Sequence, residues 1–589
     1  MSPESEEALL DALDEASAAQ LIRAHGGSVG ASSAGEDTFA FTHDKIREVL
    51  YNELNAIRRR RLHQRIGETL EKLHGAAAAE APSADQHAQD LAYHFGLAGD
   101  LARSLTYSRR AARNAERVFA HDDALKFLQQ ARESAEALNR VDEIAAIEEE
   151  VGDIHEARGV IPLAVQSYEG ALGHTTGLAA RAALKAKVGN AYVPIGDPRG
   201  LAYLEEALVE LDPKTQTNAL ALATALVGRY YHYRTEHRKA IEFLERARQL
   251  AEPLGDTDTI CNIYTYLAGA HQHLLQYDDS NRWARASIEL GERERFPLAV
   301  ALGNEFLGEN ASGRGHWDDA LAYSARNAEE GRKIGSLTRV AWAEFSRVQG
   351  LHGKGELHAA LQEALAALAL CEQCGEMRLA TWLDPMAAVV AADLGDDESA
   401  RMHAQRALER AQQLNQLVLS AWALHAEGYS AMQRGDTGPA LEWYEQYVAL
   451  VHDTENGVAR HLVMARAAEA YFLSGRLDDA THLTERAIAD ATFANAPHYL
   501  ALARRVQGQI LGARKRYDEA MSAFDEAIAA LTATGSRLEL ARAMYHRAAL
   551  RFELGDRDAA RADAAHARDE FEAMEAVRDR AMAEVVLSK

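Results

Sequence analysis

The chain has 589 residues, a formal net charge of −25 and a hydrophobic share of 47%. These values exclude a disordered chain, and no apolar run approaches the ~18 residues that a membrane span needs. The acidic charge argues against direct nucleic-acid binding, which requires a basic surface. Only three cysteines are present, which excludes a disulfide framework. We therefore expect a cytoplasmic protein that contacts neither nucleic acid nor membrane.

The opening of the chain differs in pattern from everything that follows. Pro3–Arg23 predicts a helix, Gly26–Gly35 predicts a Gly/Ser loop, and Thr38–Phe41 predicts a short strand. Two more helices are expected over Asp44–Leu54 and Ala56–Leu73. This order of elements suggests that the first 75 residues are the remainder of a winged-helix domain followed by a linker helix.

Further along, a small residue recurs at a fixed interval, and a second small residue often follows it by seven positions. The first series comprises Ala124, Ala164, Gly200, Ala240, Ser280, Ala320, Ala360, Ala400, Ala440, Ala480, Ala520 and Ala560. Small residues on one helical face let two helices pack closely, and a fixed period marks a solenoid. All but one step in the series is forty residues, and the step from Ala164 to Gly200 is shorter because Pro194–Pro198 shortens a turn there.

The period predicts an all-α fold with four segments. After the winged-helix-like segment 1–75, irregular helices over 76–120 lead into about twelve helix pairs over 121–575. A capping helix is expected over 576–589, since the pattern of Val577–Leu587 is helical and a terminal repeat needs a cover. Gly395 and Gly435, each followed by Asp, are typical of a helix end and the cap of the next helix.

The repeats resemble the tetratricopeptide repeat (TPR) family. Gly428 and Tyr444 around Ala440, and Gly508 and Phe524 around Ala520, fall on that family's glycine and aromatic positions. The resemblance implies a right-handed superhelix with a concave binding groove. The period of forty departs from the family's 34 and implies longer helices.

The block Phe39–Tyr51 resembles the winged-helix segment of signal-transduction ATPases (the STAND class) joined to TPR superhelices. That class includes large LuxR-type regulators and AAA–TPR proteins linked to kinases or cyclases. His43 and Asp44 resemble its His-Asp motif, which implies a histidine near the phosphate of ADP. The sequence contains neither a G-x-x-x-x-G-K-[ST] loop nor a LuxR-type helix–turn–helix. The resemblance therefore implies the sensor half of such a regulator, with its ATPase module outside this chain.

Three tryptophans, Trp342, Trp382 and Trp422, are also spaced by forty, and His425 and Tyr429 follow the last of them by one and two turns. In TPR proteins this position of the first helix commonly faces the groove, where aromatic rings grip a peptide or an apolar ligand. The alternative, packing between repeats, is the more common role of a repeated apolar residue. Pro385 is expected to kink or shorten the helix that carries Trp382.

A second candidate for the groove is Arg229, His232 and Tyr233, which lie in an aromatic-rich first helix and suit an anionic partner. Cys371 and Cys374 are three residues apart and could begin a metal site, with His352 and His358 on preceding elements. Zinc normally needs four ligands, so buried thiols are the better interpretation, and we expect no metal and no cofactor.

No constellation of nucleophile and base, and no isolated pair of carboxylates, stands out from the repeats, so we expect no enzyme. The predicted function is a scaffold or sensor that binds a protein, a peptide or a small effector in the concave face. Two alternatives remain: a stand-alone TPR scaffold without a nucleotide switch, and part of a nucleotide-dependent transcription regulator. The sequence does not identify the ligand or partner, the effector output or the oligomeric state.

Overall fold

The computed structural model describes residues 3–25, 38–75, 87–117, 120–193, 197–211, 217–414 and 416–588. Contacts divide the chain into two compact units, Met1–Thr175 and Thr176–Lys589. Strands occur in the described residues only at the opening of the first unit, and all other regular elements are helices. The protein is therefore an all-α chain, and the division expected at residues 75, 120 and 575 stays a prediction.

The first unit opens with helix α1 (Pro3–Ala18), strands β1 (Ile22–His25) and β2 (Thr38–Phe41), and helix α2 (Asp44–Glu53). The strand predicted at Thr38–Phe41 is present and pairs antiparallel with β1. The helix predicted to reach Arg23 is wrong in its last turn, because the chain leaves the helix at Ala18 to form β1. The predicted Gly26–Gly35 loop lies outside the described residues.

Helices complete the first unit. α3 (Ala56–Gly75) matches the predicted linker helix within two residues. The remaining helices are α4 (Ala88–Ala98), α5 (Leu101–Arg117), α6 (His121–Ala137), α7 (Val141–Ala157) and α8 (Ile161–His174).

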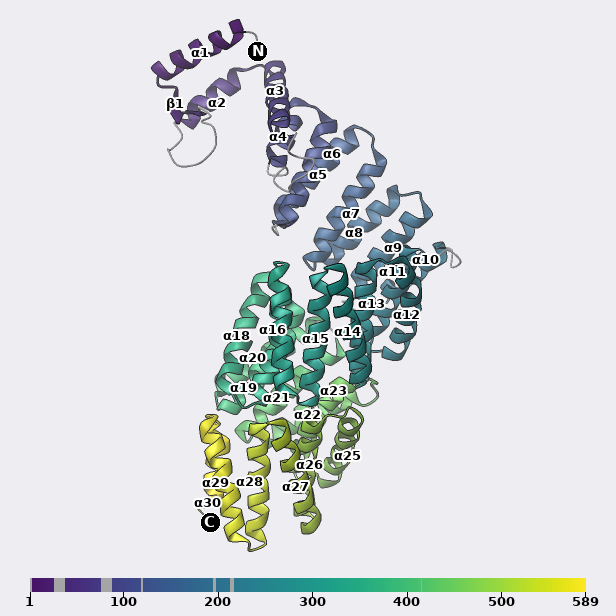
Figure 1. Cartoon of the computed structure of the whole chain (residues 1–589), viewed down its shortest axis with the longest axis vertical. Helices are drawn as coiled ribbons and strands as arrows, with labels where there is room; N and C mark the ends of the chain where they lie inside the picture. The colour runs from purple at the N-terminus through teal and green to yellow at the C-terminus, as the bar shows by residue number, and fades with distance from the viewer. Residues whose placement is uncertain are drawn as a thin grey trace. The chain divides into compact units, whose positions relative to one another are not determined.

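The second unit is a series of antiparallel helices that alternate between a first and a second helix of each pair (Figure 1). The first helices are α9 (Leu178–Tyr192), α11 (Asn218–Tyr233), α13 (Thr257–His273), α15 (Pro297–Arg314), α17 (Leu337–Gly353), α19 (Met377–Leu394), α21 (Leu417–Arg434), α23 with α24 (Gly457–His461 and Met464–Leu473), α26 (Pro497–Ala513) and α28 (Arg537–Glu553). The second helices are α10 (Arg199–Glu210), α12 (His237–Ala251, followed by the 3-10 turn η3, Glu252–Leu254), α14 (Tyr277–Glu294), α16 (Trp317–Lys333), α18 (Leu357–Cys374), α20 (Asp397–Leu414), α22 (Thr437–Val451), α25 (Leu477–Phe493), α27 (Tyr517–Thr534) and α29 (Arg557–Ala573). The last helix is α30 (Val577–Leu587), where the sequence predicts a helix, and its role as a cap stays a prediction.

The small marker residues lie near the start of the second helices, and all of them are buried. Ala240, Ala320 and Ala400 are completely buried, as is Ala407 seven residues after the last of these. A larger side chain there would separate the two helices of the pair. The forty-residue series is therefore the packing seam of the solenoid.

Helix ends recur at half that interval. Residues with positive φ stand at Thr235, Gly255, Leu275, Arg295, Gly315, Gly335, Gly355, Gly375, Gly395, Gly435, Gly475, Asn495, Lys515, Gly535, Gly555 and Glu575. At Gly395 and Gly435 the left-handed residue lets its N–H reach back to the last turn, as expected for a helix C-terminus. One left-handed turn about every twenty residues gives helices of nearly constant length.

Glycines on the first helices admit aromatic rings from the second helices. A Cβ added to Gly428 would lie 2.8 Å from the ring of Tyr444, and one added to Gly508 would lie 2.9 Å from Phe524. These are the glycine–aromatic pairs on which the TPR resemblance rests. The chain is a TPR-like helical repeat protein by this packing and by its alternating helices.

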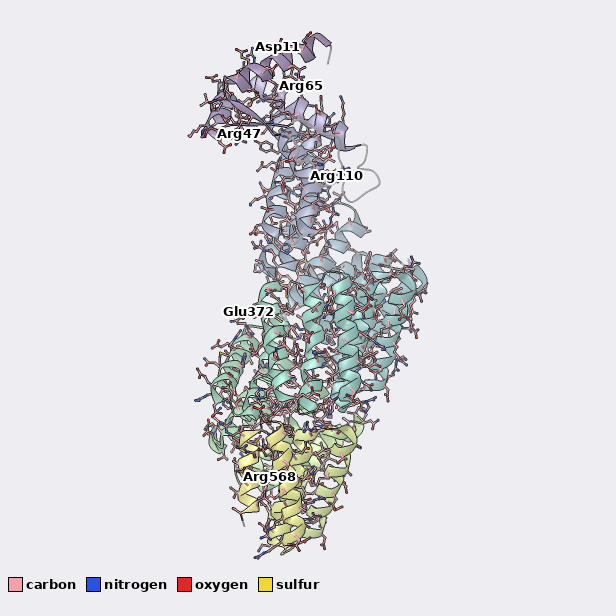
Figure 2. All side chains as sticks on the ribbon, turned by 60° about the vertical axis from the view of Figure 1, so that its left-hand side comes forward. Asp11, Arg47, Arg65, Arg110, Glu372 and Arg568 are labelled. Atoms are coloured by element: carbon pink, nitrogen blue, oxygen red, sulfur yellow. The ribbon has the colours of Figure 1, made fainter. Side chains whose placement is uncertain are left out.

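The first helices form the interior of the second unit and the second helices its outer surface. Charged side chains such as Glu372 on α18 and Arg568 on α29 point outward (Figure 2). In the interior, helices far apart in sequence meet: Trp317 Nε1 donates to Ser536 Oγ at 3.0 Å, and Arg378 Nη1 donates to Tyr233 Oη at 2.7 Å. The solenoid of this unit thus closes upon itself across 219 and 145 residues.

Two departures from a uniform repeat bear on the site. The first helix before α25 is divided into α23 and α24, and Gly457 at the start of α23 packs against Leu275. Pro385 lies inside α19, which continues without a break to Leu394, so the predicted shortening is wrong. The turn proposed at Pro194–Pro198 lies partly outside the described residues, and Pro198 caps α10.

Candidate functional site

The closed interior of the second unit contains a cavity of about 280 Å³. Its walls come from the first helices α11, α13, α15, α17, α19 and α21, and α23 and α26 contribute from farther along the chain. We call it the interior cavity, and it is lined by His232, Tyr233, Thr265, Tyr266, Gly269, Gln272, His273, Tyr277, Leu302, Glu305, Phe306, Glu309, Gly313, Arg339, Trp342, Phe345, Gln349, Glu376, Arg378, Trp382, Trp422, Val458, Leu462 and Tyr499.

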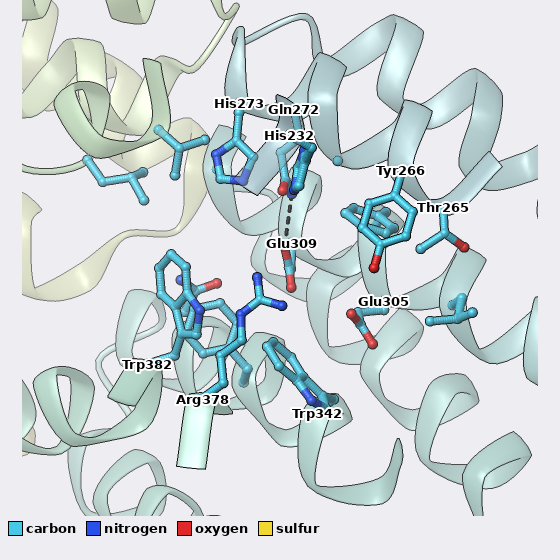
Figure 3. Close-up of a pocket in the computed structure, with 18 of the residues that line it drawn as sticks. His232, Thr265, Tyr266, Gln272, His273, Glu305, Glu309, Trp342, Arg378 and Trp382 are labelled. Atoms are coloured by element: carbon cyan, nitrogen blue, oxygen red, sulfur yellow. Dashed lines mark hydrogen bonds between the residues drawn. The ribbon is translucent and has the colours of Figure 1, made fainter. Parts of the chain in front are cut away.

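Aromatic rings make up much of the wall (Figure 3). The rings of Trp382 and Trp422 meet edge to face with centroids 5.9 Å apart, and Phe345 meets Trp382 in the same way at 5.5 Å. Trp342 instead lies beside two guanidinium groups, those of Arg339 and Arg378, each 5.9 Å from its ring. The cavity therefore offers large apolar surfaces together with charge.

The charged lining residues differ in how they are paired. Glu305 on α15 accepts a hydrogen bond from Arg339 Nη1 at 2.6 Å, so these two charges compensate each other. Glu309, one turn later on α15, accepts only from the Gln272 amide at 3.0 Å among the described residues. In the part of the chain that the structure describes, Arg378 donates only to Tyr233 Oη at 2.7 Å. Figure 3 shows Arg378 pointing across the cavity toward Glu309.

Burial shifts the pKa values of these groups. Burial, and then the nearby charge of Glu305, raise the pKa of Glu309 to about 8, although Gln272 and Arg378 oppose the shift. Burial also lowers the pKa of His273 to about 4 and that of His232 well below its usual value. Burial therefore favours the neutral forms of His232, His273 and Glu309.

Several polar atoms of the wall are buried without a hydrogen-bond partner among the described residues. They are Arg378 Nε, His232 Nδ1, Gln349 Oε1 and Trp422 Nε1. A buried polar group without a partner costs about 1–3 kcal/mol, so such groups are normally satisfied by water or ligand. All four atoms belong to residues that line the interior cavity.

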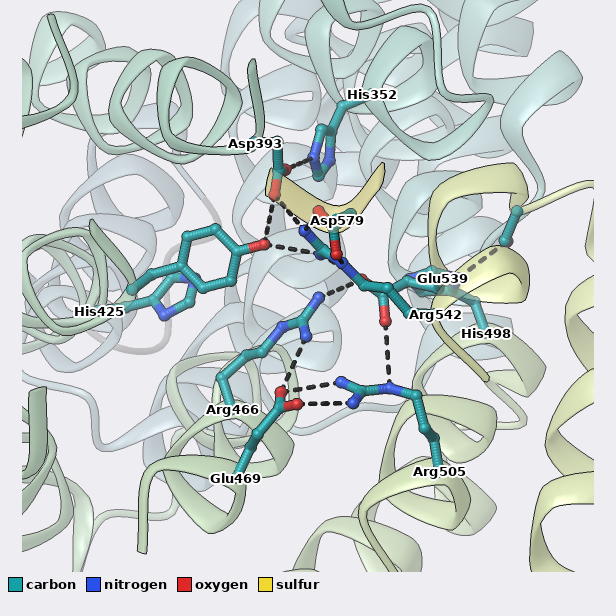
Figure 4. Close-up of polar contacts among 12 residues, drawn as sticks. His352, Asp393, His425, Arg466, Glu469, His498, Arg505, Glu539, Arg542 and Asp579 are labelled. Atoms are coloured by element: carbon teal, nitrogen blue, oxygen red, sulfur yellow. Dashed lines mark hydrogen bonds and ion pairs between the residues drawn. The ribbon is translucent and has the colours of Figure 1, made fainter. Parts of the chain in front are cut away.

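A second cavity of about 90 Å³ lies next to the interior cavity and shares Gln349, Trp422, Leu462 and Tyr499 with it. Behind it lies a buried set of charges that we call the ion network (Figure 4), formed by His352, Asp393, Arg466, Glu469, Arg505, Glu539, Arg542 and Asp579. Arg542 on α28 donates to Asp393 on α19 at 2.7 Å and to Asp579 on α30 at 2.8 Å. The network thus ties the C-terminal helices to the middle of the solenoid.

The residues predicted for the groove divide between these two sites. Trp342, Trp382, Trp422, His232 and Tyr233 line the interior cavity. His425 and Tyr429 line the smaller cavity, where both are buried. His425 bonds with Tyr444 at 3.1 Å, and Tyr429 donates to Asp393 at 2.6 Å. Arg229 is set back behind the wall, with its guanidinium over the rings of Tyr233 and Tyr266 and bonded to Asn190.

The prediction did not include Glu305, Glu309, Arg339 or Arg378. A sequence signal was present, because Arg339 and Arg378 precede Trp342 and Trp382 by three and four residues and so share their helix face. Glu305 and Glu309 are likewise one turn apart on α15.

The remaining candidates lie elsewhere. His43 and Asp44, in the first unit, are both exposed at the start of α2, and Asp44 lies 3.7 Å from Arg47. Cys371 is buried, and burial raises the pKa of its thiol to about 12, while His352 and His358 pair with Asp393 and Glu575. Within the described ranges, no group of three or more His, Cys, Asp or Glu side chains is placed to hold a metal ion. In the same ranges, no helix combines the length and apolarity needed to cross a bilayer.

Comparison with known proteins adds structures but no family. No family model and no curated protein matches the chain. Among solved structures, it is similar to a Rap protein complexed with Competence and Sporulation Factor, with 15% identity, a TM-score of 0.47, and coverage of 60% of this chain and 98% of that one. The APC/C hetero-tetramer Cut9-Hcn1 is similar at 14% identity and a TM-score of 0.47, covering 83% and 97%. Aspartyl phosphate phosphatase F from Bacillus subtilis is similar at 15% identity and a TM-score of 0.38, covering 60% and 94%.

Proposed function

We propose that the second unit is a non-catalytic sensor that binds a small effector in the interior cavity. The observation that carries this proposal is a cavity that combines aromatic walls with residues whose buried polar atoms have no hydrogen-bond partner among the described residues. Ligand sites characteristically combine apolar walls with a few oriented polar groups. Binding there would touch six successive first helices at once, so an occupant would stabilise one curvature of the solenoid.

The residues that line the cavity favour binding without covalent chemistry. None of the residues that line the cavity is a serine or a cysteine, and the buried histidines are held neutral by burial rather than paired with a carboxylate there. A nucleophile beside an oriented base is the usual requirement for covalent catalysis. The wall offers recognition groups instead.

The wider context that we propose is a regulator of the signal-transduction ATPase class. Its support is the sequence block at Phe39–Tyr51 together with the β1–β2 hairpin that precedes α2. In this proposal His43 and Asp44 contact the nucleotide of a separate ATPase module. Titration of the full chain with ADP in the presence and absence of a candidate ATPase partner tests it, with His43→Ala as the variant. Equal complex formation under all conditions would favour a scaffold without a nucleotide switch.

A protein partner at the opening segment is a second candidate function. Helix α2 has no buried residue, and Val49 and Leu50 on it are 55% and 44% exposed. Exposed apolar side chains in a cluster often mark contact surfaces. Loss of a partner in pulldown with Val49→Asp, and its retention with the exposed control Glu48→Asp, would support this role.

The effector proposal is tested by filling the cavity. Thr265 is a partly buried lining residue, and Thr265→Trp would place a large ring in the space that an effector needs. Thermal-shift measurements with a small-molecule library should yield ligands that stabilise the wild type and not this variant. Folding is checked by circular dichroism. If every stabilising compound stabilises the wild type and Thr265→Trp equally, binding in the cavity is refuted.

A further inference from the structure

A guanidinium and a carboxyl group face the interior cavity from different helices, and neither has an ion-pair partner within 4 Å among the described residues. They are Arg378 on α19 and Glu309 on α15. We propose, building on the proposed effector function, that the occupant is a zwitterion of the α-amino-acid type with an apolar or aromatic side chain. Its carboxylate binds Arg378, and its ammonium group binds Glu309.

Arg378 has the features of a carboxylate site. Its guanidinium has five N–H donors, and the described residues satisfy one of them, through Tyr233 Oη at 2.7 Å. Its Nε is buried and has no partner in the same part of the chain. The planar group lies 4.8 Å from the ring centroid of Tyr233 and 5.9 Å from that of Trp342, which fixes its orientation. A pre-oriented guanidinium with free donors binds a carboxylate through two parallel hydrogen bonds.

Glu309 has the complementary features of an ammonium site. Its carboxyl group accepts from Gln272 Nε2 at 3.0 Å, and no cationic side chain of the described ranges is in contact with it. Burial and the neighbouring Glu305 raise its pKa to about 8, against the opposing effects of Gln272, Arg378 and Arg339. An ammonium group beside Glu309 would restore its ionised form and remove this penalty. An anionic ligand beside Glu309 would raise its pKa further and disfavour its ionised form.

The other charges of the wall bear on which groups remain open to the ligand. Glu305 and Arg339 are bonded at 2.6 Å and neutralise each other. Glu376, two residues before Arg378, also faces the cavity and offsets part of the Arg378 charge. Charges of both signs therefore line the cavity, so a ligand with one positive and one negative group can pair with Arg378 and Glu309 at the same time.

The remaining wall accounts for the side chain of the ligand. Trp342, Trp382 and Phe306 present aromatic surface to the cavity. A volume of about 280 Å³ lies just below the range that is typical of ligand pockets, roughly 300 to 1,000 Å³. A single amino acid with an apolar or aromatic side chain therefore suits the space better than an extended peptide.

The test compares three forms of one molecule. Calorimetry of the full chain with each of the twenty standard L-amino acids identifies the strongest binder. Its decarboxylated amine and its deaminated acid are then measured. We expect both analogues to bind at least tenfold more weakly than the amino acid, which is the effect of losing one charged hydrogen-bonded contact.

Two variants separate the roles of the two charges. Arg378→Met should weaken binding of the amino acid and of the acid by tenfold or more but leave the amine unchanged. Glu309→Gln should weaken the amino acid and the amine but leave the acid unchanged. Arg406→Met on α20, which removes an outer pair with Glu372, is the matched control and should have no effect. If Arg378→Met does not fold, Arg378→Lys, which keeps the charge but not the two-pronged geometry, should show a smaller loss.

Different results would contradict the zwitterion proposal and the effector function on which it rests. Binding of no amino acid, or equal binding of either analogue, would overturn the zwitterion. If, at the same time, another kind of compound is bound by the wild type and excluded by Thr265→Trp, the cavity remains an effector site with a different ligand. If no compound distinguishes those two proteins, the effector function itself is wrong.

Discussion

Arg542→Met is the substitution that most directly tests how the second unit is held closed. The guanidinium of Arg542 bonds with Asp579 at 2.8 and 2.9 Å, with Asp393 at 2.7 Å, with Tyr429 at 2.8 Å and with Glu539 at 2.9 Å. Methionine has a similar length but carries no charge, so the substitution leaves several buried carboxylates without their shared cation.

Removing one member of a buried ion pair typically costs about 3–5 kcal/mol, because the partner charge stays buried and uncompensated. Since Arg542 forms ion pairs with several carboxylates, we expect the free energy of unfolding to fall by an amount at the upper end of that range. Urea unfolding followed by circular dichroism measures it. Because solenoids can lose terminal repeats separately, hydrogen exchange should show the loss concentrated in α28 and α30.

The matched control is Arg516→Met, which removes an exposed ion pair with Glu519 within one turn. Exposed pairs are screened by water and salt, so this variant should unfold like the wild type. An Arg542→Met protein that also unfolds within about 1 kcal/mol of the wild type would refute the view that the ion network closes the solenoid.

Three further predictions concern packing and titration. Gly428→Ala places a Cβ 2.8 Å from the buried Tyr444 ring and should lower the free energy of unfolding by about 1–3 kcal/mol in a urea titration. The control Gly438→Ala, whose Cβ would have nothing within 4 Å, should be neutral or slightly stabilising in the same titration. Equal effects of the two substitutions would contradict the packing seam. Burial opposes ionisation of Asp393, but Arg542 and His352 lower its pKa to about 2. The stability that this ionised carboxylate contributes is therefore complete above about pH 4 and is lost as the pH falls toward 2. The free energy of unfolding of Asp393→Asn should fall less steeply over this pH range than that of the wild type. The same pH dependence in both proteins would contradict this prediction. The pKa of Glu309 is raised from 4.5 to about 8, so without ligand this group binds more protons in the folded than in the unfolded state. The free energy of unfolding of the wild type relative to Glu309→Gln should therefore fall between pH 5 and 8 and stay constant at higher pH. A difference that does not change with pH would show that Glu309 ionises normally.

The repeat architecture was predictable because it depends on local requirements. Ala240, Ala320 and Ala400 mark a packing seam at each pair, and Val577–Leu587 is a helix because the last repeat needs a cover. These features follow from the residues of one pair and its neighbour. The extension of the first helix to Arg23 failed because strand pairing with Thr38–Phe41 competes with helix propensity at that point.

The site was only partly predictable, because it depends on contacts between distant repeats. The spacing of Trp342, Trp382 and Trp422 put them on one helix face, either in the groove or packed between repeats, but it did not reveal that Tyr233 meets Arg378 across 145 residues. That meeting is set by the curvature accumulated over several pairs, which no single repeat specifies. For the same reason Tyr429, expected in an open groove, proved to be bonded to Asp393 and Arg542 in the ion network.

A crystal structure of the full chain grown with the strongest-binding effector tests the central claim most directly. The account predicts continuous density inside the interior cavity, in contact with Trp342 and Trp382 and within hydrogen-bond distance of Arg378 or Glu309. Density for that effector on the outer surface of the second helices, with the interior cavity holding only water, would contradict it.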